Sequence, residues 1–179
     1  MRNFNSKKLS IFVALVMMIS MVAGMSVTAQ AAANDNVSIT INGTSFTKAQ
    51  MVSYQDVGIF TRQKKTGATE TYRVIGIKIS DLLADVVNSS NANPNSITVS
   101  SPDNTHDPNT PYVKTINRPA DGWDDVMLIW EKKKAIGNGQ YGPDLISNTF
   151  ETAVKETETA PSPANLWVKN VTIMTTNMN

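Results

Sequence analysis

Alternating apolar and polar positions predict several short β-strands along this chain. Val37, Ile39 and Ile41 alternate with Ser38 and Thr40, which is typical of a strand with one buried face. The same signal, enriched in β-branched and aromatic residues, predicts further strands at residues 57–65, 69–75, 96–100, 112–116, 125–132 and 166–175. The first two of these are expected to form a hairpin through a turn at residues 66–67.

Two of the predicted strands show which of their faces is buried. In residues 125–132, one face carries Val126, Leu128 and Trp130, and the other carries Met127 and Ile129. A strand that is apolar on both faces is expected in the middle of a covered sheet, and the lysines at 132–134 are expected to form its solvated end. In the last strand, Trp167, Val171 and Ile173 are expected to face the core.

Two short helices are predicted beside these strands. Thr47 and Gln50 have the spacing of a capping box, which predicts a helix immediately after Thr47. A second helix is expected after a turn at Gly76, with Ser80 as its N-cap and residues 82–87 supplying an apolar face. Together these elements predict a single α+β domain with a mixed, mostly antiparallel β-sheet and two or three short helices.

The N-terminal segment has the three-part pattern of a secretory signal peptide. Residues 1–8 are basic and contain no acid, residues 9–25 are almost wholly apolar, and residues 29–31 (AQA) form a small-x-small cleavage pattern. We therefore expect a signal peptide at 1–31, a polar tail at 32–36 and the folded domain at 37–179. A retained membrane anchor is the alternative. After cleavage, the protein is expected to be secreted, with no attachment to the membrane.

Charge and cysteine content narrow the functions open to the chain. Removal of Arg2, Lys7 and Lys8 with the signal peptide leaves 13 Lys and Arg residues against 15 Asp and Glu residues. The resulting net charge of −2 argues against nucleic acid or an anionic membrane as a partner, since both require a basic surface. The chain has no cysteine, which excludes disulfides, thiol catalysis, thiolate metal sites and iron–sulfur clusters.

Four segments of the chain carry a family resemblance. They are residues 45–51 (SFTKAQM), 72–83 (YRVIGIKISDLL), 97–103 (ITVSSPD) and 166–173 (LWVKNVTI). Together they resemble the molybdopterin-binding oxidoreductase domain of the sulfite oxidase group, especially its small secreted bacterial members. The resemblance extends over residues 37–175 and implies a sulfite-oxidase-like fold, a molybdopterin cofactor and oxidoreductase chemistry.

The chain departs from this family at the positions that carry the chemistry. The family's enzymes bind molybdenum through a cysteine thiolate, which this chain cannot supply. The pyrophosphate of the cofactor requires cationic donors, and the only arginines after residue 31 are Arg62, Arg73 and Arg118. Asn104 stands where the family has glycine. The resemblance therefore implies the scaffold without the enzyme: we expect no cofactor, and molybdopterin is the alternative.

The candidate ligand-binding residues lie in and after an irregular stretch at residues 101–118, which is rich in Pro, Asn and Asp. Oxygen ligands surround the single histidine there, and they suit a hard cation such as calcium, although a solvated surface histidine is the alternative interpretation. A tryptophan after the following turn is a candidate contact residue. The candidates are Asp103, Asn104, His106, Asp107, Arg118 and Trp123. No catalytic residue is assigned, and the identity of any metal is unknown.

Three functions remain open at this point. The first is a secreted, non-catalytic binding or interaction module on a molybdopterin-oxidoreductase-like scaffold, with a small ligand or an envelope or extracellular protein as its partner. The second is a molybdopterin-binding oxidoreductase domain that is degenerate or depends on a partner chain. The third is a structural protein of the cell envelope. The first is the prediction we carry forward.

Overall fold

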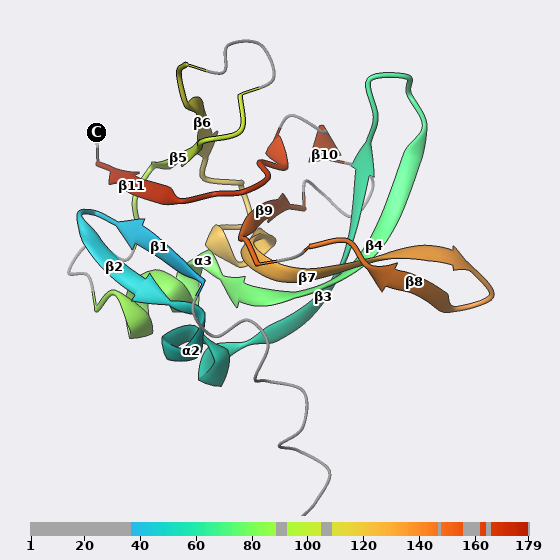
Figure 1. The fold of residues 1–179 in the computed structure, drawn as a ribbon, viewed down its shortest axis with the longest axis horizontal. Coiled ribbons are helices and arrows are strands. Elements are labelled where there is room, and N and C mark those ends of the chain that lie inside the picture. Colours follow the sequence, from blue (N-terminus) through green and yellow to red (C-terminus); the bar gives the residue numbers. More distant parts are fainter. Residues whose placement is uncertain are drawn as a thin grey trace, which may run out of the picture. The chain divides into compact units, whose positions relative to one another are not determined.

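The computed structural model describes residues 37–88, 93–104, 109–146, 148–155, 162–163 and 166–178 (Figure 1). In chain order the elements are β1 (Ser38–Ile41), β2 (Thr44–Thr47), α2 (Lys48–Met51), η1 (Val52–Tyr54), β3 (Asp56–Gln63), β4 (Thr69–Lys78), α3 (Ile79–Asp81), η2 (Leu82–Val86), β5 (Ser96–Ser101), β6 (Tyr112–Asn117), η3 (Trp123–Asp125), β7 (Val126–Gly137), β8 (Gln140–Asp144), β9 (Glu151–Val154), β10 (Ser162–Pro163) and β11 (Ile173–Asn177). The predicted signal peptide and polar tail, residues 1–36, lie outside the described residues.

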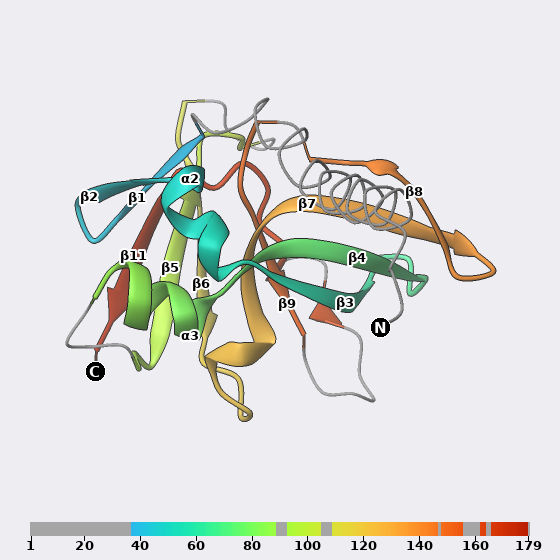
Figure 2. The same ribbon diagram turned by 90° about the horizontal axis from the view of Figure 1, so that it is seen from below.

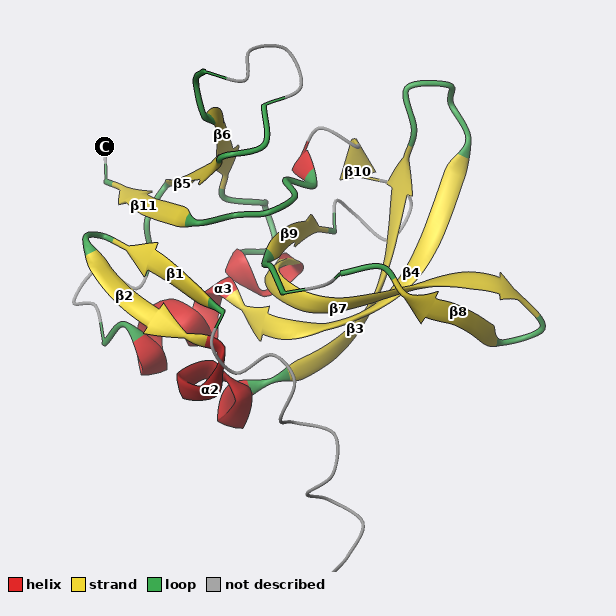
Figure 3. Cartoon of the chain, in the orientation of Figure 1, coloured by secondary structure: helices red, strands yellow, loops and turns green. Residues whose placement is uncertain are grey.

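The strands form two sheets. One has the order β2-β1-β11-β5-β6, and the other has the order β10-β3-β4-β7-β8 with β9 also paired to β7. Among the described strands, only the β1–β11 and β10–β3 pairs are parallel. Figure 3 shows that strands dominate and that the helical segments are short. The predicted α+β class with mixed, mostly antiparallel sheets and short helices is therefore confirmed.

Strand β7 connects the two clusters of buried side chains. Val126, Leu128 and Trp130 belong to the larger cluster, which also contains the inward residues of β1, β5 and β11 and the apolar side chains of α3 and η2. Met127 and Ile129 belong to a smaller cluster on the opposite face, with Phe60, Tyr72 and Trp167. All five β7 residues are buried. The predicted central strand, covered on both faces, is confirmed.

The first helix begins where the sequence predicts it. The Thr47 backbone N–H donates to Gln50 Oε1 over 2.8 Å, which completes the expected capping box. Figure 2 shows α2 and α3 side by side over the sheet that contains β5 and β11. None of the helices that the structure describes has the length and apolar content needed to span a bilayer.

The turn predicted at Gly76 is wrong, because this glycine lies inside β4. The pairing of β4 with β7 shifts register between Ile75 and Gly76. A Cβ at Gly76 would lie 2.2 Å from the backbone oxygen of Leu128, so glycine lets the two strands approach closely at the bulge. The strand continues to Lys78, which is the N-cap of α3. Ser80 is not the cap, and its hydroxyl donates to Asp124 instead.

The last strand begins later than predicted. Val168 and Val171 bond to the backbone near β9: Thr152 N–H donates to Val168 O, and Val171 N–H donates to Phe150 O. Asn170, with φ of 50°, turns the chain between these contacts. This detour shifts the alternation, so Ile173 is 47% exposed instead of buried.

Candidate functional site

The structure separates the residues that the sequence grouped as a binding site. In the β5–β6 hairpin, Ser101 pairs with Tyr112 at one end and Ser96 pairs with Asn117 at the other. Asp103 and Asn104 follow the first end, whereas Arg118 follows the second. A six-residue strand, about 17 Å long, therefore lies between them. His106 and Asp107 lie outside the described residues.

The loop carboxylate and amide make local contacts. Asp103 is exposed, and its backbone N–H donates to Ser101 Oγ over 3.0 Å. Asn104 Nδ2 donates to Thr110 Oγ1 over 3.3 Å. Within the described ranges, no three His, Cys, Asp or Glu side chains gather to hold a metal ion. A calcium site at this loop depends on residues outside those ranges and stays a prediction.

Arg118 and Trp123 both contact the segment that precedes β5. Arg118 Nη1 donates to Asn93 Oδ1 over 2.7 Å, and the side chain is exposed. Trp123 is only 3% exposed, and its indole N–H donates to Pro94 O over 2.9 Å. Because this hydrogen bond satisfies the indole, the ring can be buried in the larger cluster. Trp123 is therefore a core residue, and the proposed surface contact through it is wrong.

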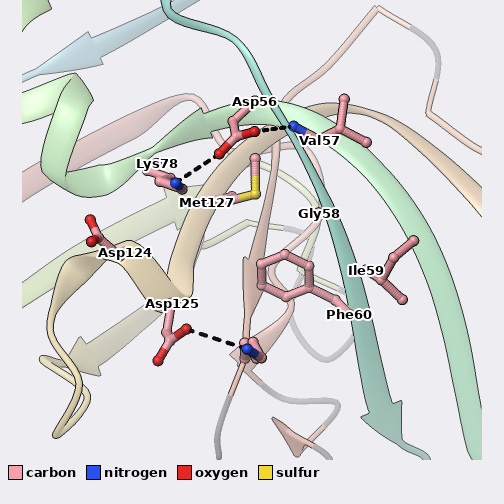
Figure 4. Close-up of a pocket in the computed structure, with 10 residues that line it drawn as sticks. Asp56, Val57, Gly58, Ile59, Phe60, Lys78, Asp124, Asp125 and Met127 are labelled. Atoms are coloured by element: carbon pink, nitrogen blue, oxygen red, sulfur yellow. Dashed lines mark hydrogen bonds and ion pairs between the residues drawn. The ribbon is translucent and has the colours of Figure 1, made fainter. Parts of the chain in front are cut away.

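A groove that the sequence did not indicate lies along one side of β3 (Figure 4). Its volume is about 310 Å³. Its lining, which we call the β3 groove, consists of Asp56, Val57, Gly58, Ile59, Phe60, Lys78, Asp124, Asp125, Met127 and Lys155. Figure 4 shows the apolar side chains of Phe60 and Met127 between a charged group at Asp56 and another at Asp125.

Glycine at position 58 lets the Phe60 ring lie across its own strand. A Cβ at Gly58 would be 2.3 Å from the Phe60 ring and 3.3 Å from the sulfur of Met127. Phe60 is 4% exposed and Met127 is 1% exposed, so these two side chains form a closely packed apolar wall.

The charged side chains of the groove are held in pairs from different elements. Lys78 Nζ lies 2.8 Å from Asp56 Oδ2, and Lys155 Nζ lies 3.9 Å from Asp125 Oδ1. The bond from Lys78 and a second bond from the Val57 N–H hold the pKa of Asp56 below its usual value. The same pairing raises the pKa of Lys78. Both groups of this pair are charged at neutral pH.

Asp124 differs from the other two carboxylates of the groove. It is exposed and accepts a hydrogen bond from the Ser80 hydroxyl. In the part of the chain that the structure describes, no Lys or Arg lies within ion-pair distance of it. The groove thus presents three carboxylates against two ammonium groups, which gives it a negative charge that suits a cation.

A second polar cluster, which the sequence pattern does not indicate, is centred on Glu70. Glu70 is 8% exposed and pairs with Lys134, Lys64 and Arg62 at 2.7, 2.9 and 3.1 Å. It also accepts a hydrogen bond from the Tyr72 hydroxyl over 2.7 Å. The hydrogen bonds from Lys134 and Lys64 hold the pKa of Glu70 well below its usual range. Its donors come from β3, β4, β7 and the β3–β4 turn, so only the folded chain assembles the cluster.

Lys132 corrects the expectation of a solvated strand end. Its side chain is 3% exposed and forms an ion pair with Glu151, which is 6% exposed. The ammonium lies 5.7 Å from the centre of the Tyr72 ring and 6.0 Å from that of Trp167. The bulge opposite Gly76 inserts one extra residue into β7, which moves Lys132 to the face of the smaller cluster. Burial lowers the pKa of Lys132.

A comparison with protein-family models and a comparison with curated proteins found no match to this chain. The resemblance to the sulfite oxidase group therefore remains a prediction that rests on four short segments of the sequence. Function is therefore inferred from the groove and the ionic clusters themselves.

Proposed function

We propose that this chain is a secreted, non-catalytic binding or interaction module on a scaffold that resembles the molybdopterin-binding domain of the sulfite oxidase group. The observation that carries the proposal is the β3 groove: an open recess whose walls are fixed by packing and ion pairs. A recess with preorganised walls and a few placed charges is the usual form of a recognition site.

The electrostatics of the groove favour binding over acid–base catalysis. A general acid or base works best when its pKa lies near the ambient pH. The pKa values of Asp56 and Lys78 are shifted away from neutrality by their mutual pair. An ionised carboxylate and a protonated amine that are already paired can position a ligand, but they exchange protons poorly near pH 7.

The arginines do not fit a molybdopterin pyrophosphate. Arg62 is bound to Glu70 and Tyr72, and Arg73 lies 3.5 Å from Glu131. In the β3–β4 pairing Arg62 lies opposite Glu70, and Arg73 lies opposite Ile59 on the other face of the sheet. Arg118 follows β6, at one end of the other sheet. Together with the missing thiolate, this arrangement supports a scaffold without the cofactor.

Native mass spectrometry of protein exported by its own host tests the proposal, combined with elemental analysis and pterin fluorescence. We expect a retained ligand or partner that is lost from Asp124→Asn and kept by the matched surface control Asp85→Asn, whose carboxylate is exposed outside the groove. Near-stoichiometric molybdenum or tungsten with a pterin would overturn the proposal in favour of an oxidoreductase. Retention on washed cell wall by both variants alike, with no ligand, would indicate a structural envelope role instead.

A further inference from the structure

Strand β3 has an unpaired edge directly beside the groove. On one side it pairs with β4 over its whole length, from Asp56 to Gln63. On the other side, the described strands pair with it only at Arg62 and Gln63, through the short β10. The stretch from Asp56 to Thr61 thus has no strand partner on that side among the described residues. Such an edge is a template for an added strand.

The hydrogen-bonding groups of this edge can be assigned by alternation. In an antiparallel pair, every second residue of an edge strand directs its N–H and C=O away from the neighbouring strand. The Val57 N–H bonds to the Asp56 carboxylate over 2.7 Å, whereas the Lys64 N–H donates back across the hairpin to Ala68 O. Odd-numbered residues therefore face outward. Because Pro163 has no N–H, the parallel pairing with β10 uses the Thr61 C=O, so the open edge presents the N–H and C=O of Ile59 and the N–H of Thr61.

The side chains beside this edge offer two different environments. Val57 and Ile59 are 50% and 51% exposed and lie two residues apart, so they present two large apolar side chains beside the edge. The groove that runs along β3 is also lined by the exposed carboxylate of Asp124. A strand added here would direct alternate side chains toward the apolar pair and toward the negative groove.

We propose that the β3 edge binds an extended peptide segment of a partner protein, which adds as a strand along residues 56–61 and inserts a lysine or arginine side chain into the β3 groove beside Asp124. The inference rests on the proposed function as a binding module and names its ligand. Main-chain hydrogen bonds to the edge supply affinity, and the alternate side chains supply specificity. The charge of the groove selects the basic residue.

The test uses two pools of capped hexapeptides and the mature protein. One pool has a fixed central lysine and the other a fixed central glutamate, with the remaining positions varied among Thr, Val and Ile. We expect the lysine pool to bind and the glutamate pool to fail. Asp124→Asn should weaken binding about tenfold, since it removes one charge-assisted contact. The matched variant Asp85→Asn, at an exposed carboxylate outside the groove, should bind as the unmodified protein does.

A second pair of variants tests the main-chain contact. Ile59→Pro removes one outward N–H and should abolish binding, whereas Ile59→Thr keeps the N–H and should retain it. If Ile59→Pro does not fold, N-methylation of alternate amides of the bound peptide makes the same test without altering the protein. Amide hydrogen exchange should slow at Ile59 and Thr61 when peptide is added.

The outcomes separate this inference from the proposed function. No binding by either pool, or binding that Asp124→Asn and peptide N-methylation leave unchanged, would overturn the peptide inference. In that case a retained ligand in native mass spectrometry would still support a binding module. A molybdenum–pterin cofactor would overturn the proposed function, whatever the peptides do.

Discussion

The buried ion pair between Lys132 and Glu151 makes the sharpest prediction about stability. Both side chains are almost fully buried, at 3% and 6% exposed. Besides its carboxylate partner, the Lys132 ammonium lies close to the faces of Tyr72 and Trp167. Lys132→Met keeps the length of the side chain and removes the charge, which leaves the Glu151 carboxylate buried without its cation.

The magnitude follows from the cost of an unpaired buried charge. Removing one partner of a buried pair costs about 3–5 kcal/mol, whereas replacing both partners by apolar residues of similar volume is often neutral or stabilising. We expect Lys132→Met to lower the free energy of unfolding by about 3–5 kcal/mol. The double variant Lys132→Met with Glu151→Leu should recover most of this loss. For a domain with a total stability of roughly 5–15 kcal/mol, the single change is large.

Urea unfolding at pH 7, followed by tryptophan fluorescence, measures these differences. The matched control is Lys133→Met, the same change one residue along β7. Lys133 is 33% exposed and pairs with Glu131 at the surface, so its loss should cost less than about 1 kcal/mol. The reasoning would be refuted if Lys132→Met cost no more than the control, or if the double variant were less stable than the single one.

Three further changes test other parts of the structure. Glu70→Gln should destabilise the protein most at neutral pH. Because the pKa of Glu70 is depressed in the folded state, the carboxylate contributes its full stability above pH 4.5 and loses it progressively as the pH falls further. The urea midpoints of the variant and the unmodified protein should therefore differ at pH 7 and converge as the pH falls below 4.5. Trp167→Ala removes a ring that is 5% exposed and should lower the free energy of unfolding by about 3–5 kcal/mol. The control Tyr54→Ala, at an exposed ring, should lower it by less than about 0.5 kcal/mol. Equal thermal midpoints for the two variants would contradict this prediction. Gly76→Ala should cost about 3 kcal/mol because its Cβ meets the backbone of β7, and Gly142→Ala, whose nearest neighbours are 3.7 Å away, should be tolerated in the same melting assay.

The short helices, the hairpin and the central strand could be predicted because each depends on residues that are close in the sequence. The Thr47–Gln50 capping box depends on residues three apart. The β3–β4 hairpin depends on two alternating runs separated by a short turn. The central position of β7 follows from its apolar residues on both faces. Each of these patterns places the interacting groups within a few residues of one another.

The candidate site could not be predicted, because its parts meet only in the folded chain. The Asp103 loop and Arg118 are close in sequence, but the β5–β6 hairpin places them at opposite ends. The β3 groove joins residues of β3, β4, η3, β7 and the chain after β9, and no sequence spacing relates them.

Lys132 shows the physical reason most directly. The run of lysines in the sequence suggests a solvated end, since burying a charge costs free energy unless a partner is present. That partner, Glu151, comes from another strand, and the bulge opposite Gly76 sets which face Lys132 occupies. Alternation along one strand predicts which of its side chains share a face. The register between strands decides which charges can be buried, because only pairing across the sheet supplies the opposite charge.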